Sequence, residues 1–334
     1  MAHPPLWLLF GAAAAYNVVA GFNSGGNLMG SFVAARAFTP TGAALVLLCG
    51  AAAGPWLVGT AVAHAIVFSV VGLPRLGPGV FLAAACAALA VLALSWWRRL
   101  PTNATLALVG ALAGAGLAAA GPAAVVWDQL GRVFASMLAA LVVGALSGGT
   151  VLAGLRFLLR RSGEGTPGTL RGLQAVTGLL QGFGYGSNDA AKATGLFALL
   201  GAWSSVAGRA ALAAGQLPVP GWAIGAALGT FGCGMLLGGA RIARRVGGGV
   251  YRVRSQDALA AQLAAGLTVI GAAAAGAPVS SNQTATAALL AAGAARRLSL
   301  PRWSLVTEMG ATWAVTLPLA IALGAAAFAL GAVA

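Results

Sequence analysis

Long apolar runs alternate with short polar or basic stretches along the whole 334-residue chain. An apolar run of roughly 17–25 residues has the length of a helix that crosses a lipid bilayer. The pattern therefore predicts a bundle of membrane-spanning helices. The runs are about Leu6–Val19, Gly42–Val71 with Pro55 as a candidate break, Val80–Trp97, Val133–Leu159, Leu196–Ala214, Trp222–Ala240, Leu259–Ala275 and Trp303–Leu330.

Four further segments are apolar but interrupted by glycine, asparagine, serine and threonine. They are Gly21–Ala35, Pro101–Ala120, Gly182–Gly195 and Pro278–Ala295. Irregular backbone at membrane depth is tolerated only where it faces protein or a water-filled cavity. We therefore expect these segments to line such a cavity.

Composition excludes a soluble globular protein, and it affects how the positive net charge of the chain is interpreted. Hydrophobic residues make up 60% of the chain and charged residues 7%, with a mean hydropathy of +0.91, whereas soluble domains carry about 25% charged residues. The net charge of +14 does not indicate nucleic-acid binding, because the arginines are scattered between apolar runs.

The arginine clusters are a topology signal, since basic loops stay on the cytoplasmic side. They lie at Arg98–Arg99, Arg156–Arg171, Arg241–Arg254 and Arg296–Arg302. We predict that all four are cytoplasmic and that both termini are extracytoplasmic, in a multi-pass protein of the cell (inner or plasma) membrane.

Two motifs recur in the same order in the two halves of the chain. Gly21–Asn27 is similar to Gly186–Lys192, at an offset of 186 − 21 = 165 residues, and Pro101–Thr105 is similar to Pro278–Asn282, at an offset of 278 − 101 = 177 residues. With the predicted topology, the two halves enter the membrane from opposite sides. This is the plan of inverted-repeat transporters, whose substrate site lies at the repeat interface near the bilayer midplane.

The predicted fold class is therefore an all-α polytopic membrane protein with two inverted-topology repeats and interrupted, re-entrant helices. The first repeat is expected at residues 1–122, a connector span with a cytoplasmic loop at 123–170, and the second repeat at 171–334. The connector resets the direction in which the second half enters the membrane.

The second motif places hydroxyls and amides at predicted helix starts. Pro101 and Pro278 suit the first turn of a helix, where a missing N–H is tolerated. Helix N-termini carry partial positive charge and open N–H donors, so they accept anions. Several converging ends would hold a tetrahedral oxyanion without arginines, which indicates a secondary transporter of an inorganic oxyanion.

Asp189 and Lys192 are the charged residues within the interrupted segments. A carboxylate at membrane depth is expensive and is usually functional, so Asp189 is a candidate for binding a coupling cation, such as sodium, or a proton. The alternative is a buried pair with Lys192, three residues later on the same helical face. Lys192, the sole lysine, is a candidate point charge for an anion or a counter-ion for Asp189.

These motifs resemble the inorganic phosphate transporter (PiT) family over nearly the whole chain. Each half of that family carries Gly-Ala-Asn-Asp with an asparagine three residues after the aspartate, and later Pro-x-Ser-Thr-Thr-His. Trp313–Pro318 also resembles the last span of the family. The resemblance implies phosphate transport coupled to sodium or protons, in a homodimer.

The chain departs from the family pattern inside these motifs. Ser24 stands where the family has aspartate, and Lys192 stands where it has asparagine. Leu106 and Gln283 stand at the histidine positions. These changes make the site more positive, and we expect Lys192 to replace a bound cation and to reduce or remove the dependence on sodium.

The predicted site follows from both motifs and from the resemblance. For substrate binding it consists of Asn23, Asn27, Thr102, Asn103, Thr105, Asn188, Lys192, Ser280, Ser281, Asn282 and Gln283. For coupling-ion binding it consists of Asn23, Ser24, Asn188 and Asp189, with Asp189 as the candidate sodium ligand.

The favoured function is a phosphate permease that works by alternating access, with the lipid bilayer and a second copy of the chain as partners. Sodium or a proton is expected as coupling ion, with no other cofactor. The main alternative is a permease of the same fold for sulfate or a related anion. A membrane enzyme acting on lipid phosphates is disfavoured, because clustered histidines, cysteines or paired carboxylates are lacking. A channel or a transport-inactive receptor stays open at this point.

Overall fold

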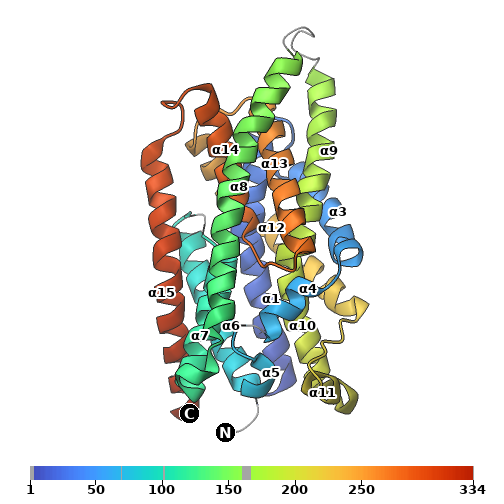
Figure 1. The fold of residues 1–334 in the computed structure, drawn as a ribbon, viewed down its shortest axis with the longest axis vertical. Helices are drawn as coiled ribbons and strands as arrows, with labels where there is room; N and C mark the ends of the chain where they lie inside the picture. Colours follow the sequence, from blue (N-terminus) through green and yellow to red (C-terminus); the bar gives the residue numbers. More distant parts are fainter. Residues whose placement is uncertain (1–3, 69, 101, 160–166, 334) are drawn as a thin grey trace.

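The computed structural model describes residues 4–68, 70–100, 102–159 and 167–333, and every regular element in these ranges is a helix. Long helices run side by side between the two ends of an elongated bundle, and both chain termini lie at the same end (Figure 1). The all-α prediction is thereby confirmed.

The first half of the chain contributes eight helical elements and a short 3₁₀ turn. In order they are α1 (Leu6–Ala20), the π-helical turn η1 (Gly21–Gly25), α2 (Gly26–Ala34), α3 (Pro40–Val58), α4 (Ala61–Phe68), α5 (Leu73–Leu76), α6 (Pro78–Trp97), α7 (Ala104–Ala120) and η2 (Pro122–Ala124). The helices α1, η1 and α2 form one continuous rod.

The rest of the chain begins with the longest helix. The elements are α8 (Trp127–Leu159), α9 (Pro167–Tyr185), the π-helical turn η3 (Gly186–Ala190), α10 (Ala191–Trp203), α11 (Val206–Ala213), α12 (Gly221–Gly249), α13 (Ser255–Ala274), α14 (Ser281–Arg296) and α15 (Trp303–Val333). The order α9, η3, α10 matches α1, η1, α2, but the two rods run in opposite directions (Figure 1).

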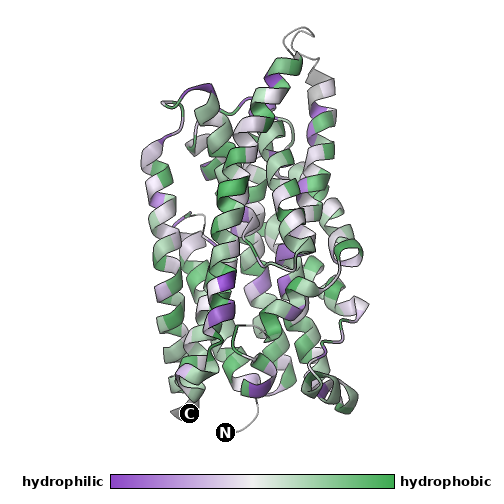
Figure 2. Ribbon diagram, in the orientation of Figure 1, coloured by the Kyte–Doolittle hydropathy of each residue, from purple (hydrophilic) through white to green (hydrophobic). Residues whose placement is uncertain are grey.

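Seven helices in the described ranges are long and apolar enough to cross a membrane. They are Leu6–Ala34, Pro40–Val58, Pro78–Trp97, Trp127–Leu158, Gly221–Gly249, Ser255–Ala274 and Trp303–Gly331. Arg171–Trp203 and Val206–Ala213 form a further, bent pair that meets at 119°. Hydrophobic residues prevail along the helices, and strongly hydrophilic residues are few (Figure 2). The chain is a multi-pass membrane protein.

Two of the predicted spans are wrong in detail. The run Gly42–Val71 is divided at Gly59, whose φ of 94° ends α3, whereas Pro55 lies inside that helix. A φ in this range is accessible to glycine and strained for other residues. The helix therefore ends at the glycine and continues through the proline. The run Leu196–Ala214 is also divided, because the chain turns sharply after Trp203.

Both π-helical turns pack against another helix through glycine. A Cβ at Gly186 would collide with the carbonyl oxygen of Ala51 in α3, and a Cβ at Gly21 would collide with the carbonyl oxygen of Phe231 in α12. Small residues allow membrane helices to approach backbone to backbone. The two turns are therefore fixed in the same way in both halves.

The short helices α7 and α14 connect the halves. Helix α7 packs on α15 and α6, while α14 packs on α8 and α13. Each of these two helices thus lies against the long helix that follows its counterpart in the other half. Both begin near mid-height and run toward opposite ends of the bundle (Figure 1).

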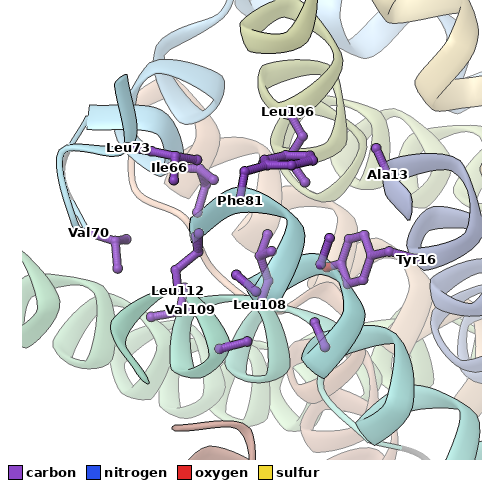
Figure 3. Close-up of a cluster of buried hydrophobic side chains, with 14 of the residues drawn as sticks. Ala13, Tyr16, Ile66, Val70, Leu73, Phe81, Leu108, Val109, Leu112 and Leu196 are labelled. Atoms are coloured by element: carbon purple, nitrogen blue, oxygen red, sulfur yellow. The ribbon is translucent and has the colours of Figure 1, made fainter. Parts of the chain in front are cut away.

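Apolar side chains fill the space beside these helices. Leu108 and Leu112 of α7 lie with Phe81 of α6 and Leu196 of α10, all of them buried (Figure 3). Tyr16 reaches from α1 toward the same group (Figure 3). The middle of α7 is therefore held in a packed apolar environment.

Several of the arginine clusters gather at one end of the bundle. Arg241 donates to the carbonyl oxygen of Trp97 at 2.9 Å, and the backbone N–H of Arg302 donates to the carbonyl oxygen of Val250 at 2.9 Å. Arg296 forms an ion pair with Asp257 at 2.9 Å. This grouping agrees with one cytoplasmic side, although residues 160–166 of the predicted cytoplasmic loop lie outside the described ranges.

Candidate functional site

The second motif starts a helix in the interior of the protein in both halves. Asn103 caps α7 with φ −105° and ψ 107°, and Ser280 caps α14 with φ −108° and ψ 107°. The two caps are separated by 280 − 103 = 177 residues, the offset found in the sequence. The repeated motif therefore has the same local structure in both halves.

The role predicted for the prolines is wrong where the structure describes it. Pro278 precedes the cap residue Ser280 by two positions and lies outside α14, while Pro101 lies outside the described residues. The segment after Pro278 is extended because Asn188 fixes it: the Asn188 Oδ1 atom accepts the N–H of Val279 at 3.0 Å. Its Nδ2 atom donates to the carbonyl oxygen of Ala277 at 2.9 Å.

The first N–H donors of both helices already have side-chain acceptors, unlike the open donors expected from the sequence. At α7, the Asn103 Oδ1 atom accepts the N–H groups of Thr105 and Leu106 at 2.9 Å and 3.1 Å. At α14, Asp189 accepts the N–H of Ser281 at 3.2 Å. The side-chain hydroxyl of Ser281 also donates to Asp189. The Asp189 carboxylate thus occupies the start of α14, where the sequence predicts a bound anion.

Lys192 connects the start of α7 to the start of α14. Its ammonium group donates to the Thr105 hydroxyl at 2.7 Å, to Asp189 Oδ1 at 3.0 Å and to the carbonyl oxygen of Val279. The side chains of Lys192 and Asp189 are 5% and 12% exposed. The predicted pair exists, and it also connects elements far apart in the sequence.

The corresponding site in the first half is built without charge. Ser24 accepts a hydrogen bond from Asn282 Nδ2 at 3.0 Å. Asn27 donates to the backbone carbonyl oxygen of Asn282 and to the Thr286 hydroxyl, both at 3.0 Å. Asn27 and Lys192, which are 165 residues apart, therefore both reach the short helix of the other half.

Three buried polar atoms of the site have no hydrogen-bond partner among the described residues. They are Asn23 Oδ1, Asn103 Nδ2 and Asn282 Oδ1. The other amide atom of each residue is bonded; for example, Asn23 Nδ2 donates to the carbonyl oxygens of Val19 at 3.2 Å and Leu92 at 3.0 Å. Orphaned buried groups are rare in proteins and require an explanation, such as a water or an ion.

Two of the predicted substrate-binding residues bond less to the rest of the site than expected. Thr102 lies beside the site, where its backbone carbonyl accepts from Asn282 at 3.3 Å, but its hydroxyl pairs with Thr316 of α15 at 2.7 Å. Gln283 is buried in the first turn of α14, where its backbone N–H donates to the hydroxyl of Ser280 at 3.4 Å.

Sequence reasoning missed several polar residues at the site. The Tyr16 hydroxyl donates to the carbonyl oxygen of Ala104 at 3.2 Å. Tyr16 and Asn17 line a cavity together with Ser24, Asp189 and Lys192. Their signal was a tyrosine and an asparagine inside an otherwise apolar run.

This central cavity is closed down to the size of one water. The space open to the centre of a water-sized sphere is ≈ 10 Å³, which is about the minimum that holds one water molecule. A tetrahedral oxyanion is several times larger than a water. The structure therefore represents a conformation in which the polar groups of both halves have closed on one another.

Comparison with known proteins decides the family. The model of the phosphate transporter family matches residues 20–324. The chain belongs to this family. Transporters of this kind move a solute without transforming it, which agrees with the prediction that the chain is not an enzyme.

Several curated proteins are similar to the chain over nearly its whole length. A "probable low-affinity inorganic phosphate transporter" of Bacillus subtilis is 28% identical, and the alignment covers 95% of this chain and 94% of that protein. A protein of the same name from Rhizobium meliloti is 28% identical over 97% of this chain and 96% of that protein. The resemblance recognised in the motifs is confirmed.

A solved structure has the same fold. It is named "The sodium-dependent phosphate transporter" and matches with a TM-score of 0.82 at 18% identity, covering 98% of this chain and 99% of that chain. The predicted polytopic fold is therefore confirmed by a match that covers 98% of this chain.

Proposed function

We propose that the protein is a phosphate permease in which the anion binds between the starting ends of α7 and α14, near the bilayer midplane. The observation that carries the proposal is the meeting of two capped helix ends inside the membrane-spanning bundle, joined by Lys192 through Thr105 and Val279. Such ends supply oriented dipoles, which favour an anion, and the Ser281 N–H, here bonded to Asp189, is a donor that an anion can take over.

The closed cavity supports a role for Asp189 in transport by alternating access. In the closed conformation, the Asp189 carboxylate accepts from the N–H and the hydroxyl of Ser281. A phosphate oxygen suits the same donors. We propose that phosphate replaces this carboxylate when the site opens and that the carboxylate returns after release.

The two halves are proposed to form inverted repeats, at residues 1–122 and 171–334, joined by the connector at 123–170. The matching cap geometry, the two π-helical turns and the opposite directions of α1 and α9 support this division. Rocking of one repeat against the other is the usual route to alternating access. The homodimer implied by the family resemblance stays a prediction.

Uptake of radiolabelled phosphate into proteoliposomes tests the proposal. We expect saturable uptake, and we expect Ser281→Ala and Thr105→Ala to reduce it about tenfold or more, because each hydroxyl bonds a charged group. Thr150→Ala is the matched control, because the hydroxyl of Thr150 bonds only within its own helix on an exposed face.

The outcomes separate the substrate from the site. Uptake of sulfate without phosphate, with the same sensitivity to Ser281→Ala, would keep the location of the site and change its substrate. Flux that does not saturate would indicate a channel. Uptake that is unchanged in both site variants would place the anion elsewhere.

A further inference from the structure

The ammonium group of Lys192 lies in a cage of oxygen atoms that has the composition of a cation site. Its neighbours are the hydroxyl of Thr105, the carboxylate of Asp189 and the backbone carbonyl of Val279. Carbonyl oxygens of unwound helix ends coordinate sodium ions in transporters of broken-helix design. The cage thus presents to an ammonium group the oxygen types that bind a sodium ion.

The three oxygens come from three different elements. Thr105 lies in the first turn of α7, Val279 precedes α14, and Asp189 lies in the π-helical turn η3. A cation at this point therefore holds the two short helices together and neutralises the carboxylate. In this protein the cation is covalently attached to α10 and cannot leave with the substrate.

The charge balance leaves no need for a free ion at this position. Asp189 has its counter-ion at 3.0 Å. The other described ion pairs, Arg245–Glu308 and Arg296–Asp257, join helix ends elsewhere in the bundle. At the corresponding place in the first half, Ser24 supplies a neutral hydroxyl, so no second carboxylate calls for a cation.

We infer that Lys192 is a tethered replacement for a coupling cation, so that the protein transports its anion without a stoichiometric requirement for sodium. The inference rests on the proposed function for its transport consequence. A second consequence does not depend on transport: removal of the lysine side chain leaves an oxygen-lined site for a free sodium ion beside Asp189.

The first measurement is phosphate uptake by the wild-type protein in proteoliposomes, with sodium, potassium or choline as the external cation. We expect equal rates in all three. The decisive variant is Lys192→Ala, which empties the cage and leaves the largely buried carboxylate of Asp189 without a counter-ion. Its uptake in choline should fall about a hundredfold, and sodium, but not choline, should restore it about tenfold or more.

A matched control separates the ion site from the loss of charge. Lys192→Met also removes the charge but fills the cage with an apolar chain of similar length. It should lose uptake to the same degree, and sodium should not restore it. Lys192→Asn is a second truncation, which gives the experiment a usable variant if Lys192→Ala does not fold.

Thermal unfolding in detergent provides a readout without transport. Sodium should raise the unfolding midpoint of Lys192→Ala relative to potassium and should leave the wild type and Lys192→Met unchanged, since a ligand stabilises only a protein that binds it. If wild-type vesicles take up no phosphate with any cation, the proposed function fails, and this measurement still tests the cage.

Two results would overturn the inference while the proposed function stands. One is wild-type phosphate uptake that requires sodium in a fixed ratio. The other is a folded Lys192→Ala or Lys192→Asn variant that responds equally to sodium and choline in both uptake and unfolding.

Discussion

The two π-helical turns share a backbone and differ in charge. At the first, Ser24 of the turn and Asn27 of the following helix α2 bond to Asn282 and Thr286 through neutral groups. At the second, Asp189 of the turn and Lys192 of the following helix α10 bond to Ser281, Thr105 and Val279 through a carboxylate and an ammonium. One backbone geometry therefore supports a neutral and a charged set of contacts, so that mutations can change the charges without changing the backbone.

The largest effect is expected from breaking the charged turn. Asp189→Asn leaves the Lys192 ammonium buried without its counter-ion, which costs about 3–5 kcal/mol in comparable pairs. We expect a steep fall in the thermal unfolding midpoint and loss of phosphate uptake. The double variant Asp189→Asn with Lys192→Met should recover the unfolding midpoint but not the uptake. Recovery of both would contradict the prediction.

The next effect tests what the two turns have in common. Gly186→Ala and Gly21→Ala each place a Cβ against the backbone of a neighbouring helix, and overpacking of this kind costs about 1–3 kcal/mol. Both variants should lower the unfolding midpoint by similar amounts. Gly225→Ala is the control, because a Cβ at that position meets nothing within 4 Å.

A third change makes the neutral turn resemble the charged one. Ser24→Asp introduces a carboxylate beside Asn282 and no cation to balance it. Uptake in choline should fall about tenfold, and sodium should restore part of it, because a buried carboxylate needs a counter-charge. Sodium-independent uptake at the wild-type rate would show that the neutral turn tolerates charge. Ser24→Thr keeps the hydroxyl and serves as the control.

The smallest effect concerns the neutral hydrogen bonds. Asn27→Ala removes the donor to the carbonyl oxygen of Asn282 and to Thr286, at a loss of about 1 kcal/mol for a neutral bond. We expect the KM for phosphate to rise about fivefold, with a small change in the unfolding midpoint. An effect as large as that of Asp189→Asn would mean that the two turns are equally important.

Sequence reasoning found the helical membrane fold and the segments that hold the two turns and the two caps, because both have local signals. Apolar length predicts spans, and the repeated Asn and Pro motifs mark the two turns and the two caps. Asp189 and Lys192 were recognisable as a pair from their spacing of three residues, which places them on one helical face.

The partners of these residues could not be predicted, because they are set by packing between distant helices. Thr316 and Thr286 lie in α15 and α14, and in the sequence they look like ordinary hydroxyls in apolar helices, which usually bond to their own backbone. The repeated motif marks the place of the two turns, but their π-helical geometry has no distinct sequence signal. The helix break predicted at Pro55 lies at Gly59 instead, because glycine readily adopts the positive φ that ends the helix there.

The crossed packing of α7 and α14 sets an order for synthesis. Helix α7 leaves the ribosome in the first half of translation, whereas its neighbour α15 follows much later. Lys192, which bonds Thr105 at the start of α7, emerges only in the second half of the chain. The polar start of α7 must therefore wait in the membrane or the insertion machinery until translation is nearly complete. Assembly of the candidate site is for this reason a late and global event, since the start of α7 acquires its partners Lys192 and Thr316 only as their helices are made.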